Sequence, residues 1–121
     1  MRLRPAILVL ALSAADVAHA ADRICVPRAT PIGLSRDIVR WSISMRAGQT
    51  CIQGLRYSSM VIDRVTLITA PKNGRVEILG SGFRFLTDPN FRGSDHFTIS
   101  VFGQIARKPG NSLLEVDATI D

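Results

Sequence analysis

The sequence predicts an all-β protein, an antiparallel β-sandwich of six or seven short strands that follows a cleaved signal peptide. Three observations support this prediction. Apolar and polar residues alternate with a period of two in several short runs, which is typical of half-buried strands. Turn-forming residues separate these runs at short intervals, and little of the chain beyond residue 20 has a helical pattern. Strands joined by turns, without a crossover helix, favour two packed antiparallel sheets.

The first twenty residues have the three parts of a secretory signal. Arg2 and Arg4 form a positive start, residues 6–15 form a short apolar core, and Ala18-His19-Ala20 matches a small-x-small cleavage site. The apolar core is shorter than the about 20 residues that span a bilayer, and a retained N-terminal anchor is the alternative. We therefore expect a signal peptide at residues 1–20, and one domain at residues 21–121 that is periplasmic or secreted and has no transmembrane anchor.

Basic residues outnumber acidic ones, and the formal net charge is +5. The excess is scattered along the chain, which is typical of a solvated surface, and attraction to an anionic partner is the alternative. For an exported protein this partner would be an unknown protein or an anionic component of the envelope, and not nucleic acid.

Two cysteines, Cys25 and Cys51, follow the predicted signal. An even number of cysteines in a small exported domain predicts a disulfide. The spacing is not that of a Cys-x-x-Cys redox pair. With His96 as the one histidine beyond the signal, the soft ligands are too few for a zinc site. We expect a Cys25–Cys51 disulfide, no metal and no cofactor.

The first strands are expected between residues 22 and 63. Residues 22–37 form an extended leading segment, with a short strand near residues 24–26. Residues 39–46 alternate strictly and predict a half-buried strand, while residues 47–50 form a turn. The pattern over 51–63 is weak, and a strand begins near residue 60. The apolar face of the 39–46 strand consists of Val39, Trp41, Ile43 and Met45, and the polar face of Arg40, Ser42, Ser44 and Arg46.

A hairpin is predicted around Asn73-Gly74. Residues 65–69 are rich in β-branched side chains, and Asn-Gly suits a type I′ turn because both residues accept positive φ. Residues 76–79 form the return strand. The turn at residues 80–82 leads into an aromatic strand at residues 83–86.

The rest of the chain predicts a corner and two more strands. Residues 88–95 are rich in turn-forming side chains, and the apolar residues of 97–101 alternate with polar ones. Residues 103–112 are expected to form an exposed loop. Residues 114–120 form a final strand with an acidic outer face.

Residues 65–120 resemble the cadherin-like and immunoglobulin-like repeat modules of exported bacterial proteins. The shared features are a Pro-x-x-Gly turn at residues 71–74, the aromatic strand Phe83-Arg84-Phe85, and the corner from Pro89 to Phe97. The resemblance implies an immunoglobulin-like or cadherin-like sandwich. In that family Tyr often stands where this chain has Phe85, and tandem copies are usual. The motif does not cover residues 22–64. The turn and corner residues that we expect to be structural are Asn73, Gly74, Pro89, Gly93, Asp95 and Phe97.

The corner also has a physical interpretation of its own. Gly93 is expected to supply a backbone shape that a side chain disfavours, and Asp95 to accept hydrogen bonds from nearby backbone N–H groups. Phe91 and Phe97 are expected to bury their rings. A calcium site at Asp88 and Asp95 is the alternative, but Arg84 and Arg92 would oppose the cation.

No catalytic residues are predicted. Asp95 and His96 are adjacent on a strand and point to opposite faces, so their side chains do not converge. None of Ser94, Ser100 and Ser112 lies in a Gly-x-Ser-x-Gly motif. A small hydrolase that combines His96 with a serine from elsewhere is the least favoured alternative.

The candidate binding face is the polar side of the 39–46 strand: Arg40, Ser42, Ser44 and Arg46. A plain solvated surface is the alternative. Trp41 on the other side is expected in the core, with a sugar-stacking platform as the alternative. We predict a non-enzymatic binding or interaction module of the cell envelope. The other possibility is a structural or adhesion-associated domain that self-associates.

Overall fold

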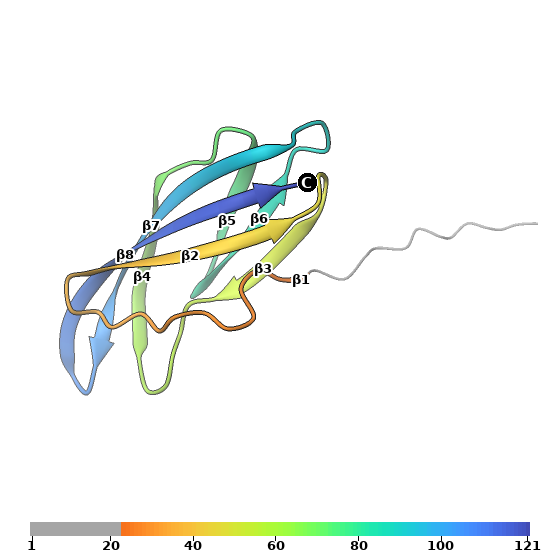
Figure 1. The fold of residues 1–121 in the computed structure, drawn as a ribbon. Coiled ribbons are helices and arrows are strands. Elements are labelled where there is room, and N and C mark those ends of the chain that lie inside the picture. The colour runs from red at the N-terminus through yellow and green to blue at the C-terminus, as the bar shows by residue number, and fades with distance from the viewer. Residues whose placement is uncertain (1–22) are drawn as a thin grey trace, which may run out of the picture.

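Every regular element over residues 23–121, the part of the chain that the computed structural model describes, is a strand (Figure 1). The predicted signal peptide lies outside the described residues. Residues 23–121 contain no helix that could cross a membrane. In chain order the strands are β1 (Arg23–Ile24), β2 (Asp37–Met45), β3 (Thr50–Gly54), β4 (Val61–Thr69), β5 (Gly74–Leu79), β6 (Gly82–Thr87), β7 (Gly93–Ile105) and β8 (Lys108–Ile120).

The strands form two sheets, with the orders β1-β3-β6-β5 and β2-β8-β7-β4. The all-β class is confirmed. The prediction of purely antiparallel sheets is wrong, because β1 runs parallel to β3 and β2 runs parallel to β8. The other neighbouring strands are antiparallel. The expected six or seven strands become eight in the described chain. The short strand expected near residues 24–26 corresponds to the two-residue β1, whereas the weak pattern over residues 51–63 did not indicate β3.

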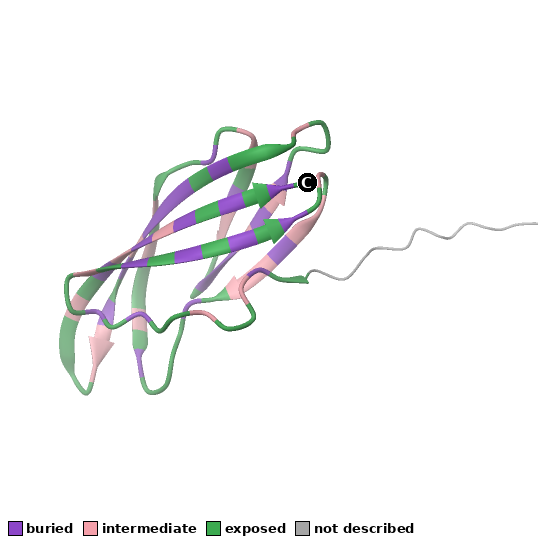
Figure 2. Ribbon diagram, in the orientation of Figure 1, coloured by how far each residue is buried: buried purple, intermediate pink, exposed green. Residues whose placement is uncertain are grey.

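The inward side chains of both sheets form one buried cluster. Figure 2 shows buried and exposed residues alternating along β2, β7 and β8, which confirms the predicted alternation. The ring of Phe97 in β7 lies 5.4 Å from that of Phe83 and 5.1 Å from that of Phe85, measured between centroids. Phe83 and Phe85 belong to β6, so these contacts join the two sheets.

The hairpin predicted at Asn73-Gly74 is wrong. β4 pairs with β7 and β5 pairs with β6, so the chain crosses from one sheet to the other between them. Neither Asn73 nor Gly74 has the positive φ of a type I′ turn. Gly74 is required for a different reason, because a Cβ there would lie 2.6 Å from the carbonyl oxygen of Leu86 in β6. The hairpin in this region is instead β5–β6, where Gly80 has φ 59°.

The loop predicted over residues 103–112 is also wrong. β7 and β8 continue through it as a paired ladder, and their connection is the two residues Ala106 and Arg107. Both have positive φ, 50° and 67°. Type I′ turns need this conformation, which residues other than Gly, Asn and Asp rarely adopt. Pro109 is tolerated in β8 because β2 pairs with β8 only from Ser112 onward.

Asp95 holds the crossover that replaces the predicted hairpin. Its carboxylate accepts hydrogen bonds from the N–H of Lys72 at 2.9 Å, of Asn73 at 2.8 Å and of His96 at 2.9 Å. The residue is 7% exposed. The predicted acceptor role of Asp95 is therefore confirmed; two of its three donors come from the β4–β5 connection and the third from β7 itself.

The other corner residues behave largely as expected. Gly93 has φ 135°, a conformation that side chains disfavour. Phe97 is fully buried, whereas Phe91 is only partly buried against the core. Pro89 lies exposed in the connection between β6 and β7.

Asp95→Asn is expected to lower the free energy of unfolding by about 2 kcal/mol. The amide keeps one acceptor oxygen but presents an NH₂ group to the second crossover N–H, which leaves a donor unpaired in a buried position. Chemical denaturation followed by circular dichroism measures the change. The matched control is Asp88→Asn, whose carboxylate is exposed and accepts one bond, from the N–H of Asn90 at 2.8 Å. Equal losses for the two variants would contradict this role of Asp95.

Candidate functional site

The predicted binding face is exposed on one side of β2. Arg40, Ser42 and Ser44 alternate with buried residues along the strand, and Arg46 follows its end; all four are exposed. β2 is an edge strand of its sheet, so the face borders β8 alone. The arrangement of the four side chains matches the prediction, while their role in binding stays a prediction.

The exposed polar surface of β2 continues across β8 and β7. The sequence pattern did not indicate this continuation, because it depends on which strands pair. In the parallel register, Ser42 lies opposite Asp117 of β8, and in the antiparallel register Asp117 lies opposite His96 of β7. The rows on either side follow the same registers. We define the polar face as the outward residues Arg40, Ser42, Ser44, Ser94, His96, Glu115, Asp117 and Thr119. Thr98 lies in the same rows of β7 but is only 9% exposed.

Charges of both signs are interleaved on the polar face. Arg40 forms an ion pair with Glu115, whose side chain is 25% exposed. The Nδ1 atom of His96 lies 3.0 Å from Oδ1 of Asp117. Acidic side chains of β8 therefore lie beside Arg40 of β2 and His96 of β7. The face suits a partner surface with its own polar groups better than a lone anion.

His96 lies between a hydroxyl group and a carboxylate, and the three groups follow one another in the order found in a catalytic triad. Its Nδ1 faces Asp117, and its Nε2 lies 3.3 Å from Oγ1 of Thr98. The side chains of His96 and Asp117 are 44% and 66% exposed. Water surrounds the pair, whereas stabilising an oxyanion relies on a water-excluded site.

The serines considered as nucleophiles do not join these three groups. Ser112 is fully buried, and its hydroxyl donates to Asp37 and accepts from the N–H of Leu34 at 2.9 Å. Ser94 and Ser100 lie on β7, on the same side as His96, but within residues 23–121 the imidazole bonds Asp117 and Thr98 and neither of these serines. As the sequence predicts, Asp95 is buried while His96 is exposed, so the two adjacent side chains do not converge.

Asp37 anchors the loop before β2. Its carboxylate accepts hydrogen bonds from Ser112 and from the N–H groups of Gly33 at 3.3 Å and Ser35 at 3.2 Å. Burial alone would raise the pKa of Asp37, but these hydrogen bonds outweigh it and hold the pKa below its ordinary value. The carboxylate is therefore ionised at neutral pH and fully engaged by the loop.

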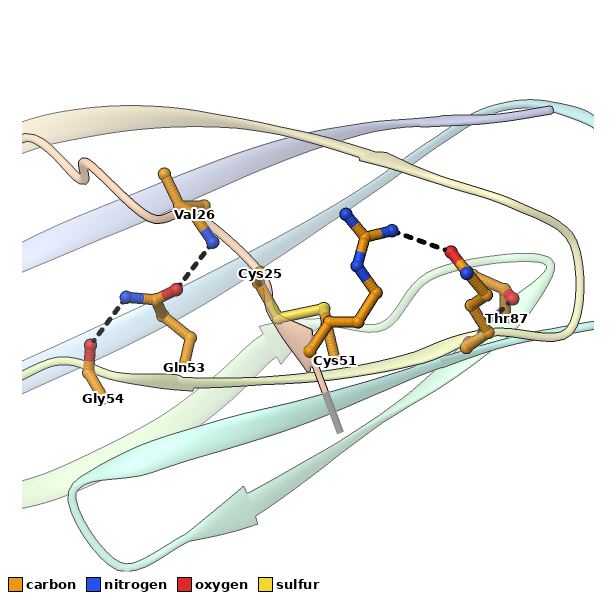
Figure 3. The surroundings of a disulfide bond; sticks show 8 residues. Cys25, Val26, Cys51, Gln53, Gly54 and Thr87 are labelled. Atoms are coloured by element: carbon orange, nitrogen blue, oxygen red, sulfur yellow. Dashed lines mark hydrogen bonds between the residues drawn. A yellow bond between two sulfur atoms is a disulfide. The ribbon is translucent and has the colours of Figure 1, made fainter. Parts of the chain in front are cut away.

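The predicted disulfide joins Cys25 to Cys51 (Figure 3). It ties the end of β1 to β3, beside a hydrogen bond from the N–H of Val26 to Oε1 of Gln53 at 2.7 Å. Cys25 and Cys51 are both buried. The bond therefore holds the residues that follow β1 against β3.

Trp41 belongs to the core, as expected. It is 4% exposed, and its Nε1 donates to the carbonyl oxygen of Thr30 at 2.9 Å. A buried indole offers no face on which a sugar can stack. Asp88 and Asp95 belong to no larger ligand cluster: within residues 23–121, no group of three or more His, Cys, Asp or Glu side chains is placed to hold a metal.

No family model matches this chain, and no curated protein matches it. Among solved structures, the solution structure of Amebosin is similar with a TM-score of 0.29 and 13% sequence identity, covering 71% of this chain and 98% of that chain. This likeness is too weak to place the chain in a family.

Proposed function

We propose that this protein is an exported, non-enzymatic binding module of the cell envelope, built as an immunoglobulin-like or cadherin-like β-sandwich. Export is supported by the signal-like sequence at residues 1–20 and by the Cys25–Cys51 bond, since disulfides persist in oxidising compartments. The partner is a protein, bound through the polar face.

The observation that carries this proposal is the continuity of the polar face over three strands. Hydroxyls, an imidazole, a guanidinium and carboxylates project from β2, β8 and β7 on a hydrogen-bonded sheet. Specific protein interfaces combine such polar groups with complementary charge, which selects the partner and its orientation. The sheet backbone holds the side chains in fixed rows, so little order has to be gained on binding.

Site-specific photo-cross-linking in the native envelope tests the proposal. A photoreactive amino acid replaces Ser42 on the polar face, and in the matched control it replaces Ser81, an exposed serine in the β5–β6 turn. We expect a saturable product from position 42, at least about tenfold weaker in Arg40→Glu, because that change sets two carboxylates side by side. A product of twice the chain mass would favour the self-associating alternative. The same products from both positions, or none from position 42, would contradict the proposal.

A further inference from the structure

A second site lies at one end of the molecule, where the loop before β2 meets the β7–β8 turn. Figure 1 shows the start of β2 and this turn at the same end. A cavity of about 520 Å³ opens between them. Its size falls within the roughly 300–1,000 Å³ of small-molecule sites. It lies beyond the start of β2 and contains none of the polar face residues.

Basic side chains outnumber acidic ones at this cavity. Arg36 and Lys108 line it from opposite sides, and Arg107 precedes Lys108 in the turn. No Asp or Glu lines it. The neighbouring Asp37 directs its carboxylate to Ser112, Gly33 and Ser35. Within residues 23–121, Arg36, Arg107 and Lys108 form no ion pair.

Both walls of the cavity are held in unusual backbone conformations. Of the five non-glycine residues with positive φ in the described chain, four flank the cavity: Leu34, Arg36, Ala106 and Arg107. Such conformations are costly and persist only where the surroundings impose them. Here Ser112 fixes the loop, because its hydroxyl donates to Asp37 and accepts from the N–H of Leu34. Gly110 lets β8 approach the loop so closely that a Cβ would collide with the carbonyl oxygen of Leu34.

The lining determines which ligand fits. Arginine and lysine side chains suit a phosphate group, because it offers several acceptor oxygens and negative charge. A single carboxylate would be a smaller ligand for the same side chains. The rest of the wall includes the apolar residues Ile105 and Pro109. A phosphate attached to an apolar group could contact the basic side chains through its oxygens and the apolar residues through the attached group.

We propose that this cavity binds a phosphate group, through Arg36 and Lys108 with Arg107 beside them, and that the phosphate is carried by a lipid headgroup. The site would place the end of the domain against an anionic membrane surface. It is separate from the polar face, so either site can be absent while the other functions.

Co-sedimentation of the purified domain, residues 21–121, with lipid vesicles tests this proposal. The vesicles contain phosphatidylcholine with or without phosphatidylglycerol, and inorganic phosphate is the competitor. We expect saturable binding to the vesicles with phosphatidylglycerol and at least about tenfold weaker binding by Arg36→Ala/Lys108→Ala. Both side chains are exposed, so the fold should persist, which thermal unfolding checks.

The matched control is Lys72→Ala/Arg92→Ala, which removes the same two charges from exposed residues outside the cavity. It should bind vesicles like the unchanged protein. Saturable binding of inorganic phosphate in solution, lost in Arg36→Ala/Lys108→Ala but without vesicle binding, would support the phosphate site and replace the lipid by a free ligand. Equal weakening in both double variants, or no binding to either probe, would overturn the proposal. Cross-linking at position 42 should survive Arg36→Ala/Lys108→Ala, which separates this test from that of the polar face.

Discussion

Phe97→Ala is expected to lower the free energy of unfolding by about 3–5 kcal/mol, the usual cost of deleting a buried phenyl ring. Phe97 is fully buried, and its ring contacts Phe83 and Phe85 of the opposite sheet. The cavity left by alanine would lie between two hydrogen-bonded sheets, and closing it would require a whole sheet to move. Since small domains are stable by only about 5–15 kcal/mol, the loss is a large part of the total. Denaturant unfolding followed by circular dichroism measures it.

The control for this prediction lies on the same strand. Phe102 points to the opposite face of β7, is 37% exposed, and has the guanidinium of Arg64 5.4 Å from its ring centroid. Phe102→Ala should cost about 1 kcal/mol or less. If Phe97→Ala does not fold, Phe97→Leu provides the measurement, with an expected loss of about 1–1.5 kcal/mol. Equal losses for the two alanine variants would mean that the sheets do not pack through Phe97.

Strands with one buried and one exposed face were the most predictable part of this fold. In β2 and in the parts of β7 and β8 that were expected as strands, the period of two assigns alternate residues to the core, and the burial of Trp41, Ile99 and Val116 follows that assignment. The pattern is reliable because a slip of one residue would exchange the two faces of the strand. The corner residue Gly93 was predictable as well, since its backbone requirement is local. The acceptor role of Asp95 was predictable from its residue type, but its donors Lys72 and Asn73 were not, because they lie 23 and 22 residues away.

Strand partners were much less predictable, because pairing depends on contacts between distant segments. Asn73-Gly74 has the composition of a tight hairpin, but tertiary pairing places β4 and β5 in different sheets. The opposite happens at Ala106-Arg107, where a two-residue turn forms without the residues that favour it. There the long β7–β8 ladder imposes the turn geometry.

In the candidate site, too, the exposure of single residues was predictable, whereas contacts between strands were not. Period two was enough to place Arg40, Ser42 and Ser44 on one exposed side of a strand. The pairing of Arg40 with Glu115 joins residues 75 positions apart and depends on the parallel β2–β8 register. The parallel pairing of β2 with β8 has no turn in the sequence that would indicate it, since the two strands are connected through the rest of the domain.

Loss of the Cys25–Cys51 disulfide is expected to lower the free energy of unfolding by about 3.5 kcal/mol on the chain-entropy account, because the bond closes a 26-residue separation. It also anchors residues 25–35, the central part of the leading segment, to β3. This segment buries Ile32 and Leu34, and its Thr30 carbonyl accepts the indole hydrogen bond of Trp41. Denaturant unfolding with and without a thiol reductant measures the loss.

The fluorescence of Trp41 adds a local measurement to the global one. It is the chain's single tryptophan and is 4% exposed, so loosening of the leading segment should admit water to the indole and shift its emission to longer wavelength. The control is Cys25→Ala/Cys51→Ala, which should match the reduced protein in both measurements and should not respond to reductant. A reduced protein that keeps both its unfolding free energy and its emission would contradict the prediction. In that case the burial of Ile32 and Leu34 and the Trp41–Thr30 hydrogen bond would be sufficient to hold the segment without the disulfide.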